Sequence, residues 1–253
     1  MGTARAQQLS DVEGEARWLN TYELEKEGSS DTYSTTTTAA FGTAPGTYSL
    51  RINATDNSAN KNSNTSESIL LTVTSPQVIT YDFSTNARVD RWAYRNQHNE
   101  QPPLTNNVPT TEFSSRRYTL IAADDRRRQE DSSSRRGYYA LHRFEFTIAE
   151  EVGNITRMNV LWSGQGRHQL ARQHGATLYI WNYNTRAYEQ LDQSFSRRPG
   201  TLEGTILSNF GDYLDNDGRL MLIAEQNSPQ LQFWRWQFRS RIGTDYVKVD
   251  ITL

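Results

Sequence analysis

The sequence predicts an all-β protein that consists of a short β-sandwich module followed by a larger jelly-roll β-sandwich. From Gly175 onward, runs of alternating residues are separated by turns rich in Asn, Asp and Gly, a pattern typical of sandwiches. Hydrophobic residues make up only 35% of the chain while aromatic residues reach 11%, so we expect a core of large rings inside a polar surface. A length of 253 residues fits two such units.

The first 76 residues predict the shorter module. Tyr48, Leu50 and Ile52 alternate with polar residues and therefore fall on one face of a strand. A second strand over residues 68–74 ends at Pro76, because proline has no backbone N–H to donate to a sheet. We place the boundary between the two units at this proline.

A polar, acidic segment, residues 1–28, precedes this module, and its alternating stretch at residues 18–24 predicts one strand. The strands visible before Pro76 are too few for a closed sandwich, so residues 29–76 are expected to be only part of one. Either the sequence begins inside the module, or a strand of another chain completes it. Both explanations stay open, and in the second one residues 1–28 are the candidate exchanged strand, since an open hydrophobic edge must be covered.

Residues 77–253 predict the jelly roll, since eight or nine strands follow one another there. The longest predicted strand covers residues 138–148 and places His142, Phe144, Phe146 and Ile148 on its core face. His142 is therefore expected to be a hydrogen-bonded core residue. One short helical turn is predicted over residues 118–124.

The segment from Thr43 to Thr74 contains the turn and strand PGTYSLRINATD, a loop rich in Asn and Ser, and the strand ILLTVT. This order resembles the last two strands of the Ig-like modules of bacterial and archaeal surface proteins. The resemblance implies that residues 29–76 belong to an Ig-like sandwich, which has about seven strands when complete.

The second unit contains the Trp92 strand and the stretches ITRMNVLWSG, GATLYIWNYNTRAYEQL, DYLDNDGRLML and TDYVKV. Together they resemble the galactose-binding-like jelly rolls of secreted archaeal and bacterial multidomain proteins. The resemblance covers most of residues 78–253. It implies carbohydrate attachment, adhesion or structural spacing, without choosing among them.

Composition excludes several classes of protein. The formal net charge of −2 argues against nucleic-acid binding, which needs a clustered basic surface. The chain has no cysteine, which excludes disulfides and thiolate chemistry, and no apolar run long enough to predict a membrane span. Its first residues also lack the apolar stretch of a secretory signal. Asn-x-Ser/Thr sequons at Asn53, Asn64 and Asn154 are candidate glycosylation sites and favour an extracellular or cell-surface location.

No pattern in the sequence predicts an enzyme. A phosphate-binding glycine loop, a nucleophile elbow and a zinc-binding helix are all missing from it. The carboxylates of Asp215 and Asp217 stand in a DNDG turn, with Asp212 nearby, and a structural calcium ion is the one cofactor that they suggest. His168 and His174 flank a glycine-rich loop without a visible third ligand, so a solvated loop is favoured over a metal site.

Aromatic residues are the main candidates for ligand binding. In the strand ATLYIWNY, the side chains of Leu178 and Ile180 are expected to face the core. Tyr179, Trp181 and Tyr183 would then form an outward row that can stack on sugar rings, unless a further layer covers it. Trp162 is a further candidate of this kind.

In the burst FWRWQF, Phe233 and Arg235 are expected at the surface as ligand-binding candidates, with Trp234, Trp236 and Phe238 in the core. Arginines are also clustered between residues 116 and 136, interleaved with acidic residues. The mixture of charges favours a salt-bridged loop, and contact with acidic glycans or a neighbouring subunit stays open.

We therefore expect a non-catalytic extracellular structural or adhesive protein of a cell surface, filament or large secreted assembly. A carbohydrate-binding module that uses exposed aromatic residues is the alternative, and a virion surface protein is a third. The expected partners are other copies of the chain or neighbouring surface proteins, bound through sheet edges, and polysaccharide.

Overall fold

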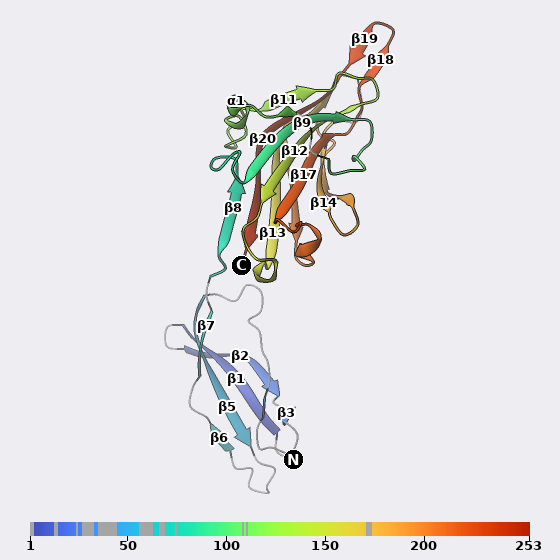
Figure 1. The fold of residues 1–253 in the computed structure, drawn as a ribbon. Coiled ribbons are helices and arrows are strands. Elements are labelled where there is room, and N and C mark those ends of the chain that lie inside the picture. The colour runs from blue at the N-terminus through green and yellow to red at the C-terminus, as the bar shows by residue number, and fades with distance from the viewer. Residues whose placement is uncertain are drawn as a thin grey trace. The chain divides into compact units, whose positions relative to one another are not determined.

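The computed structural model divides the chain into two compact units, Met1–Pro76 and Gln77–Leu253 (Figure 1). It describes residues 3–12, 15–23, 25–26, 33–34, 45–55, 63–65, 69–73, 75–107, 109, 111–170 and 174–253. For nearly all strand residues of the first unit, the description covers the backbone and not the side chains. The side chains of Asn53 and Asn64, and the face occupied by Tyr48, Leu50 and Ile52, therefore lie outside it.

The first unit contains a five-stranded antiparallel sheet. Its order is β2 (Glu15–Glu23), β1 (Thr3–Val12), β5 (Gly46–Thr55) and β6 (Ser63–Thr65), and β7 (Ile69–Val73) also pairs with β5. The short strands β3 (Glu25–Lys26) and β4 (Tyr33–Ser34) form a separate ladder. Because β1 lies between β2 and β5, the first 28 residues contribute two strands to a sheet of their own chain, where the sequence predicts one.

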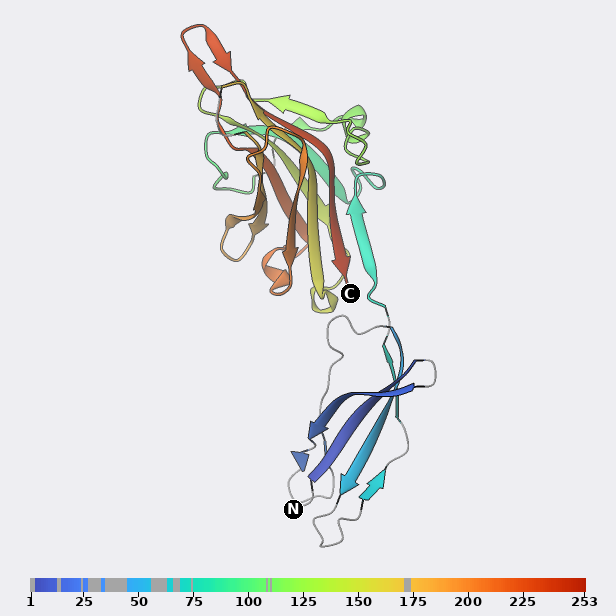
Figure 2. The same cartoon turned by 180° about the vertical axis from the view of Figure 1, so that it is seen from behind.

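The second unit is a sandwich of two antiparallel sheets, as the sequence predicts (Figures 1 and 2). The six-stranded sheet has the order β10 (Thr111–Glu112), β9 (Arg91–His98), β12 (Tyr139–Thr147), β17 (Arg219–Gln226), β14 (Ala176–Asn182) and β15 (Ala187–Gln193). The five-stranded sheet has the order β11 (Gln129–Ser132), β20 (Ser240–Thr252), β13 (Arg157–His168) and β16 (Gly200–Ile206), and β8 (Val78–Asp82) also pairs with β20.

Helical structure in the described part of this unit is limited to short turns. These are α1 (Ser115–Tyr118) and the 3-10 turns Val152–Asn154 and Phe210–Asp212. The predicted turn at residues 118–124 thus lies a few residues earlier. Its last residue, Tyr118, is buried, and its hydroxyl accepts a hydrogen bond from the backbone N–H of Ala93. The remaining strands, β18 (Leu231–Phe233) and β19 (Trp236–Phe238), pair as a hairpin.

The main core lies between the two sheets and is built from alternate residues of facing strands. Phe144 and Phe146 of β12 are fully buried there, together with His142, which confirms the predicted core face of this strand. Large buried side chains of this kind stabilise the folded state by about 1.5–3 kcal/mol each. The core of large rings that the composition predicts is therefore present.

Trp162, which the sequence names as a candidate for ligand binding, belongs to this core. It alternates along β13 with Met158 and Val160, all of which point between the sheets and are almost completely buried. Its indole N–H donates a hydrogen bond of 2.9 Å to Thr244 Oγ1. The strand period turns its ring inward, so Trp162 does not belong to an exposed aromatic surface.

One close backbone approach in the second unit yields a test of packing. A Cβ atom added to Gly166 of β13 would lie 1.8 Å from the carbonyl oxygen of Gly175, a backbone atom that cannot turn away. Gly166→Ala is therefore expected to lower the free energy of unfolding by roughly 1–3 kcal/mol. Urea denaturation followed by tryptophan fluorescence measures this change.

The matched control is Gly153→Ala, since nothing lies within 4 Å of the added Cβ there. This substitution should shift the free energy of unfolding by less than about 0.5 kcal/mol. Equal stability of the two variants would show that the approach of the two backbones at Gly166 is looser than described.

Candidate functional site

The central strands β12, β17 and β14 of the six-stranded sheet are buried on both faces, and the second face carries the main candidate site. We call this second face, which points away from the main core, the outer face. A separate cluster of buried apolar side chains lies on it: Leu141, Tyr179, Trp181, Tyr188, Met221 and Ile223. The inner residues of the same strands, such as Leu178, Ile180 and Leu222, belong to the main core.

The strand register arranges the outer face in rows that cross the sheet. One row joins Leu141, Glu225 and Thr177 on β12, β17 and β14. The next row joins Arg143, Ile223 and Tyr179 in the same way. In a third row Glu145 lies opposite Met221, and Trp181 lies opposite Tyr188 of β15. Aromatic, apolar and charged side chains therefore share one surface.

The predicted aromatic row Tyr179, Trp181 and Tyr183 faces away from the main core, as expected, but it is not an exposed surface. Tyr179 is only 6% exposed and Trp181 only 4%, while Tyr183 is half-buried. Trp181 packs edge-to-face on Tyr188, with ring centroids 4.9 Å apart. The expectation of exposure is wrong because neighbouring strands place equally large side chains beside these rings, and a loop lies over the sheet.

That loop, residues 99–107, follows β9 and is held against the sheet by two hydrogen bonds. The guanidinium of Arg143 donates to the carbonyl oxygen of Asn106. The side-chain amide of Gln101 donates to the backbone oxygen of Gln226, at 3.3 Å. A cleft of about 350 Å³ remains between the two segments that line it, residues 100–104 of the loop and residues 186–188 at the start of β15.

Glu225 is the most unusual group on the outer face. Its side chain is completely buried, and neither carboxylate oxygen has a hydrogen-bond partner among the described residues. Burial raises the pKa of Glu225 well above its ordinary value. A buried polar group without a partner costs about 1–3 kcal/mol, so this carboxyl is poised to accept a donor that the chain itself does not supply.

Other polar atoms of the outer face are buried and unpartnered as well. They are the hydroxyl oxygens of Tyr183 and Tyr188 and Nε of Arg143. The remaining guanidinium nitrogens of Arg143 are engaged, since Nη2 lies 2.7 Å from the carboxylate of Glu145. A ligand seated here would find both aromatic surface and hydrogen-bonding groups that are already desolvated.

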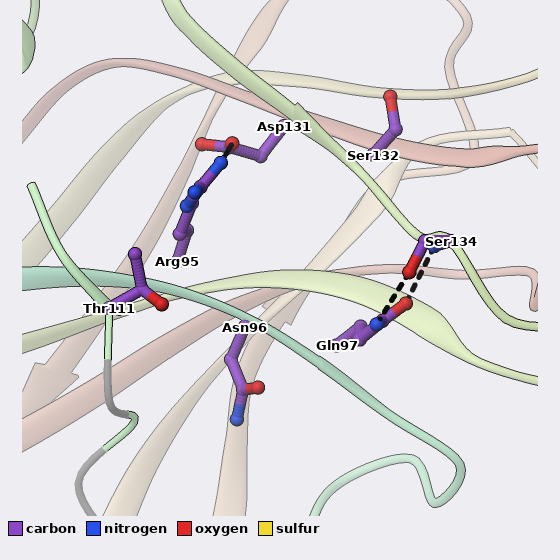
Figure 3. A pocket seen from close by; sticks show the side chains of 7 residues that line it. All are labelled: Arg95, Asn96, Gln97, Thr111, Asp131, Ser132 and Ser134. Carbon is purple, nitrogen blue, oxygen red and sulfur yellow. Dashed lines mark hydrogen bonds and ion pairs between the residues drawn. The ribbon is translucent and has the colours of Figure 1, made fainter.

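A second hollow, the polar pocket, has a volume of about 330 Å³ and lies beside β9 and β11 (Figure 3). Its lining residues are Arg95, Asn96, Gln97, Thr111, Asp131, Ser132 and Ser134. Figure 3 shows Arg95 reaching toward Asp131 and Gln97 toward Ser134, and both pairs are hydrogen-bonded. Since these groups satisfy one another, the pocket is a weaker candidate than the outer face.

Behind this pocket, a chain of hydrogen bonds crosses the main core. The N–H of Trp162 donates to Thr244, Thr244 donates to Nδ1 of His142, and Nε2–H of His142 donates to Asp131 at 3.1 Å. The tautomer follows from the ends of the chain, because an indole only donates and a carboxylate only accepts. Burial lowers the pKa of His142, although Asp131 opposes this.

The calcium site that the sequence suggests is not assembled among the described residues. The described residues contain no group of three or more His, Asp or Glu side chains that could hold a metal ion. Asp215 instead caps its turn by accepting the backbone N–H groups of Asp217 and Arg219, and Asp217 is paired with Arg219 at 2.7 Å. Asp212 lies in a 3-10 turn. His168 is buried in β13 rather than solvated, and residues 171–173 of its loop lie outside the description.

Two further predictions concern the surface. Phe233 and Arg235 are exposed, as expected, but Trp234 and Trp236 are exposed too and not in the core. The reason is that β18 and β19 form a hairpin that projects from the sandwich, so neither of its faces meets a second layer (Figure 1).

The sequon residue Asn154 is exposed as well. The arginine-rich segment between residues 116 and 136 contains ion pairs, such as that of Arg127 with Asp125.

Sequence reasoning missed Glu225, although the strand RLMLIAEQ contains a signal for it. Both sets of alternate residues in this strand are apolar, which indicates that both faces of the strand are buried. Glu225 stands at the end of one of those sets.

No helix among the described residues is long and apolar enough to cross a membrane.

Residues 88–253 match the model of a protein family described as "Uncharacterized protein, C-terminal domain". The search of curated proteins found no match. Among solved structures, the chain is similar to one described as "xylan-binding module CBM15", with 13% identity and a TM-score of 0.34 over 71% of this chain and 97% of that chain.

A second solved structure is described as the "structural basis for the promiscuous specificity of the carbohydrate-binding modules from the beta-sandwich super family". Its identity is 12% and its TM-score 0.24, over 97% of this chain and 85% of that chain. Identities and TM-scores this low carry no argument about what the present chain binds.

The chain of hydrogen bonds through His142 predicts how stability depends on pH. Burial alone would raise the pKa of Asp131, but hydrogen bonds from His142 and Gln129 and the charge of Arg117 hold it at about 2. The unfolded chain takes up this proton near pH 4, so acidification below about pH 4 favours unfolding. We expect Asp131 to contribute about 2 kcal/mol above that pH, and to lose this contribution as the pH falls toward its folded pKa.

Asp131→Asn should therefore lower the free energy of unfolding at neutral pH and flatten its fall between about pH 4 and pH 2. Denaturant titrations at a series of pH values measure both effects. Asp217→Asn is the control, because this carboxylate is 70% exposed. A variant at Asp131 that kept the wild-type acid dependence would contradict the assignment.

Proposed function

Because the chain belongs to the family described as "Uncharacterized protein, C-terminal domain", whose description names no activity, we propose a function from its own surfaces. The protein is a non-catalytic, cell-surface adhesive module that attaches to polysaccharide through the outer face of its six-stranded sheet. This joins the adhesive role expected from the sequence with its carbohydrate-binding alternative. The proposal includes a galactose-binding-like jelly roll for residues 77–253 and a partial Ig-like module for residues 29–76.

The observation that carries this proposal is the unpartnered carboxyl of Glu225 beside an aromatic cluster. A sugar ring presents hydroxyl groups at its edge and apolar C–H groups on its faces. The hydroxyls would donate to Glu225 and pair with the free phenol oxygens of Tyr183 and Tyr188. The C–H faces would pack on aromatic rings, which are favoured surfaces for such contacts.

The dimensions of the face suit an extended ligand. Glu225 and Met221 are four residues apart on β17, which is about 13 Å along a strand. The cleft beside Tyr188 has a volume of about 350 Å³, within the usual range of ligand pockets. Entry requires the 99–107 loop to move, and this loop is tied to the sheet by the few hydrogen bonds of Gln101 and Arg143.

The carboxylates of the outer face support binding rather than catalysis. Glycosidases place two carboxyl groups about 5–9.5 Å apart across the bond that they cleave. Glu145 lies opposite Met221 and thus about 13 Å along the sheet from the level of Glu225. It is also neutralised by Arg143, so it is not free to act as an acid or base.

Attachment to neighbouring copies remains a second proposal. The strands β15 and β16 are seven residues long and lie at the edges of their sheets, and edge strands are the places where another strand can add. The exposed sequon residue Asn154 is compatible with the extracellular location that we propose.

Glu225→Leu separates a binding role from a structural one. Removing an unpartnered buried carboxyl should leave the free energy of unfolding unchanged or raise it, by up to about 1–3 kcal/mol. Affinity for a soluble polysaccharide should fall roughly tenfold or more, because the acceptor for a sugar hydroxyl is lost. Affinity electrophoresis against a broad polysaccharide panel, followed by calorimetry on any positive, measures binding.

The matched control is Glu203→Leu, the same change at an exposed residue of β16 in the other sheet. It should leave polysaccharide affinity unchanged. If the wild-type protein bound no member of the panel, or if Glu225→Leu lost stability and kept its affinity, carbohydrate binding at the outer face would be ruled out.

A further inference from the structure

The hairpin of β18 and β19, here called the aromatic hairpin, is a second interaction surface that the proposed polysaccharide site does not use. Its register pairs Leu231 with Phe238 and Phe233 with Trp236, which leaves a two-residue turn of Trp234 and Arg235. Figures 1 and 2 show it as an arm that projects beyond the end of both sheets.

The tip of the aromatic hairpin exposes three large apolar side chains within four residues. Trp234 is 96% exposed, Trp236 is 73% exposed and Phe233 is 58% exposed. Single exposed hydrophobic residues are ordinary, but a contiguous group marks a surface that meets a partner. Nothing in the described part of the sandwich covers these rings, because the arm extends past it.

The backbone conformation at the tip of the hairpin is a second indication of a functional surface. Trp234 has a φ of 54°, in the left-handed region where glycine or asparagine is usual at a turn. A bulky residue in this conformation is strained, and strain of this kind is concentrated at functional sites. The turn at the tip therefore carries a tryptophan in a backbone conformation that a smaller residue would adopt with less strain.

The charge around the tip identifies the kind of partner. Arg235 in the turn and Arg239 directly after β19 are both exposed, and no acidic residue stands between Asn227 and Thr244. The chain as a whole has a formal charge of −2, so this positive segment stands out against its background. An anionic surface that also accepts apolar rings would complement it.

We propose that the aromatic hairpin docks on an anionic phospholipid bilayer. Tryptophan prefers the interface between headgroups and acyl chains, where its ring is buried and its N–H stays hydrated. Arginine pairs with lipid phosphate through its planar fork. The tip is convex and would need a rigid partner with a matching hollow, whereas a bilayer deforms around it. The protein would therefore lie on a membrane surface by this arm without spanning it.

Sedimentation with vesicles of equal parts phosphatidylcholine and phosphatidylglycerol tests this proposal on the full chain. We expect binding that falls with rising salt and a blue shift of tryptophan fluorescence. The double variant Trp234→Ala with Trp236→Ala should bind at least roughly tenfold more weakly. Arg235→Ala should weaken binding roughly fivefold and reduce its salt dependence.

Phe195→Ala is the matched control, because Phe195 is an exposed aromatic residue on a different loop of the same unit, 61% exposed. It should bind vesicles like the wild type. The proposal is overturned if the wild type does not bind anionic vesicles, or if the tryptophan variant binds them equally well. Equal binding to pure phosphatidylcholine, or retention only on an acidic polysaccharide such as heparin, would also overturn it. Because Glu225→Leu leaves the hairpin intact, vesicle binding by that variant separates this proposal from the polysaccharide site.

Discussion

The second unit depends on one constraint, which is that the three central strands of its six-stranded sheet are buried on both faces. An antiparallel sheet can leave one face in water, but β12, β14 and β17 carry large apolar side chains on both. The inner face is covered by the five-stranded sheet. Among the described strands of this unit no second sheet packs on the outer face, so its own rings and the 99–107 loop exclude water from it.

The residues that cover the outer face do not supply a partner for every polar group buried there. A sheet packed against another sheet can bury apolar groups alone, whereas the outer face also buries Arg143, Glu145 and Glu225. The first two neutralise each other, and Glu225 is left without a partner in the described chain. Buried polar groups that lack partners are rare in folded proteins, and a ligand that supplies them is the simplest physical reason to retain them. The polar groups of the main core differ, because Trp162, Thr244, His142 and Asp131 form a satisfied chain that ties the two sheets together.

The aromatic hairpin differs from the outer face because no layer packs against it in the described part of the chain. A two-stranded arm that leaves the sandwich has no layer to pack on, so every side chain at its tip meets solvent or a partner. Its rings are exposed for this reason, while chemically similar rings of Tyr179 and Trp181 are buried a few strands away. Burial of an aromatic residue in this protein depends on the layer that faces it and not on its own strand.

Residue alternation by itself determined the strands, the two-sheet class and the inner faces of β12 and β14, because a period of two follows from backbone geometry alone. It assigned Phe144 and Ile180 correctly and turned Tyr179 away from the main core. It failed for Trp162, Trp181, Trp234 and Trp236, since alternation separates the two faces of a strand but does not say which face is covered. Only the tertiary structure decided that, by bringing the 99–107 loop over one sheet and by projecting one hairpin beyond both. These long-range placements, and the isolation of Glu225 that results from them, are not encoded in any short stretch of sequence.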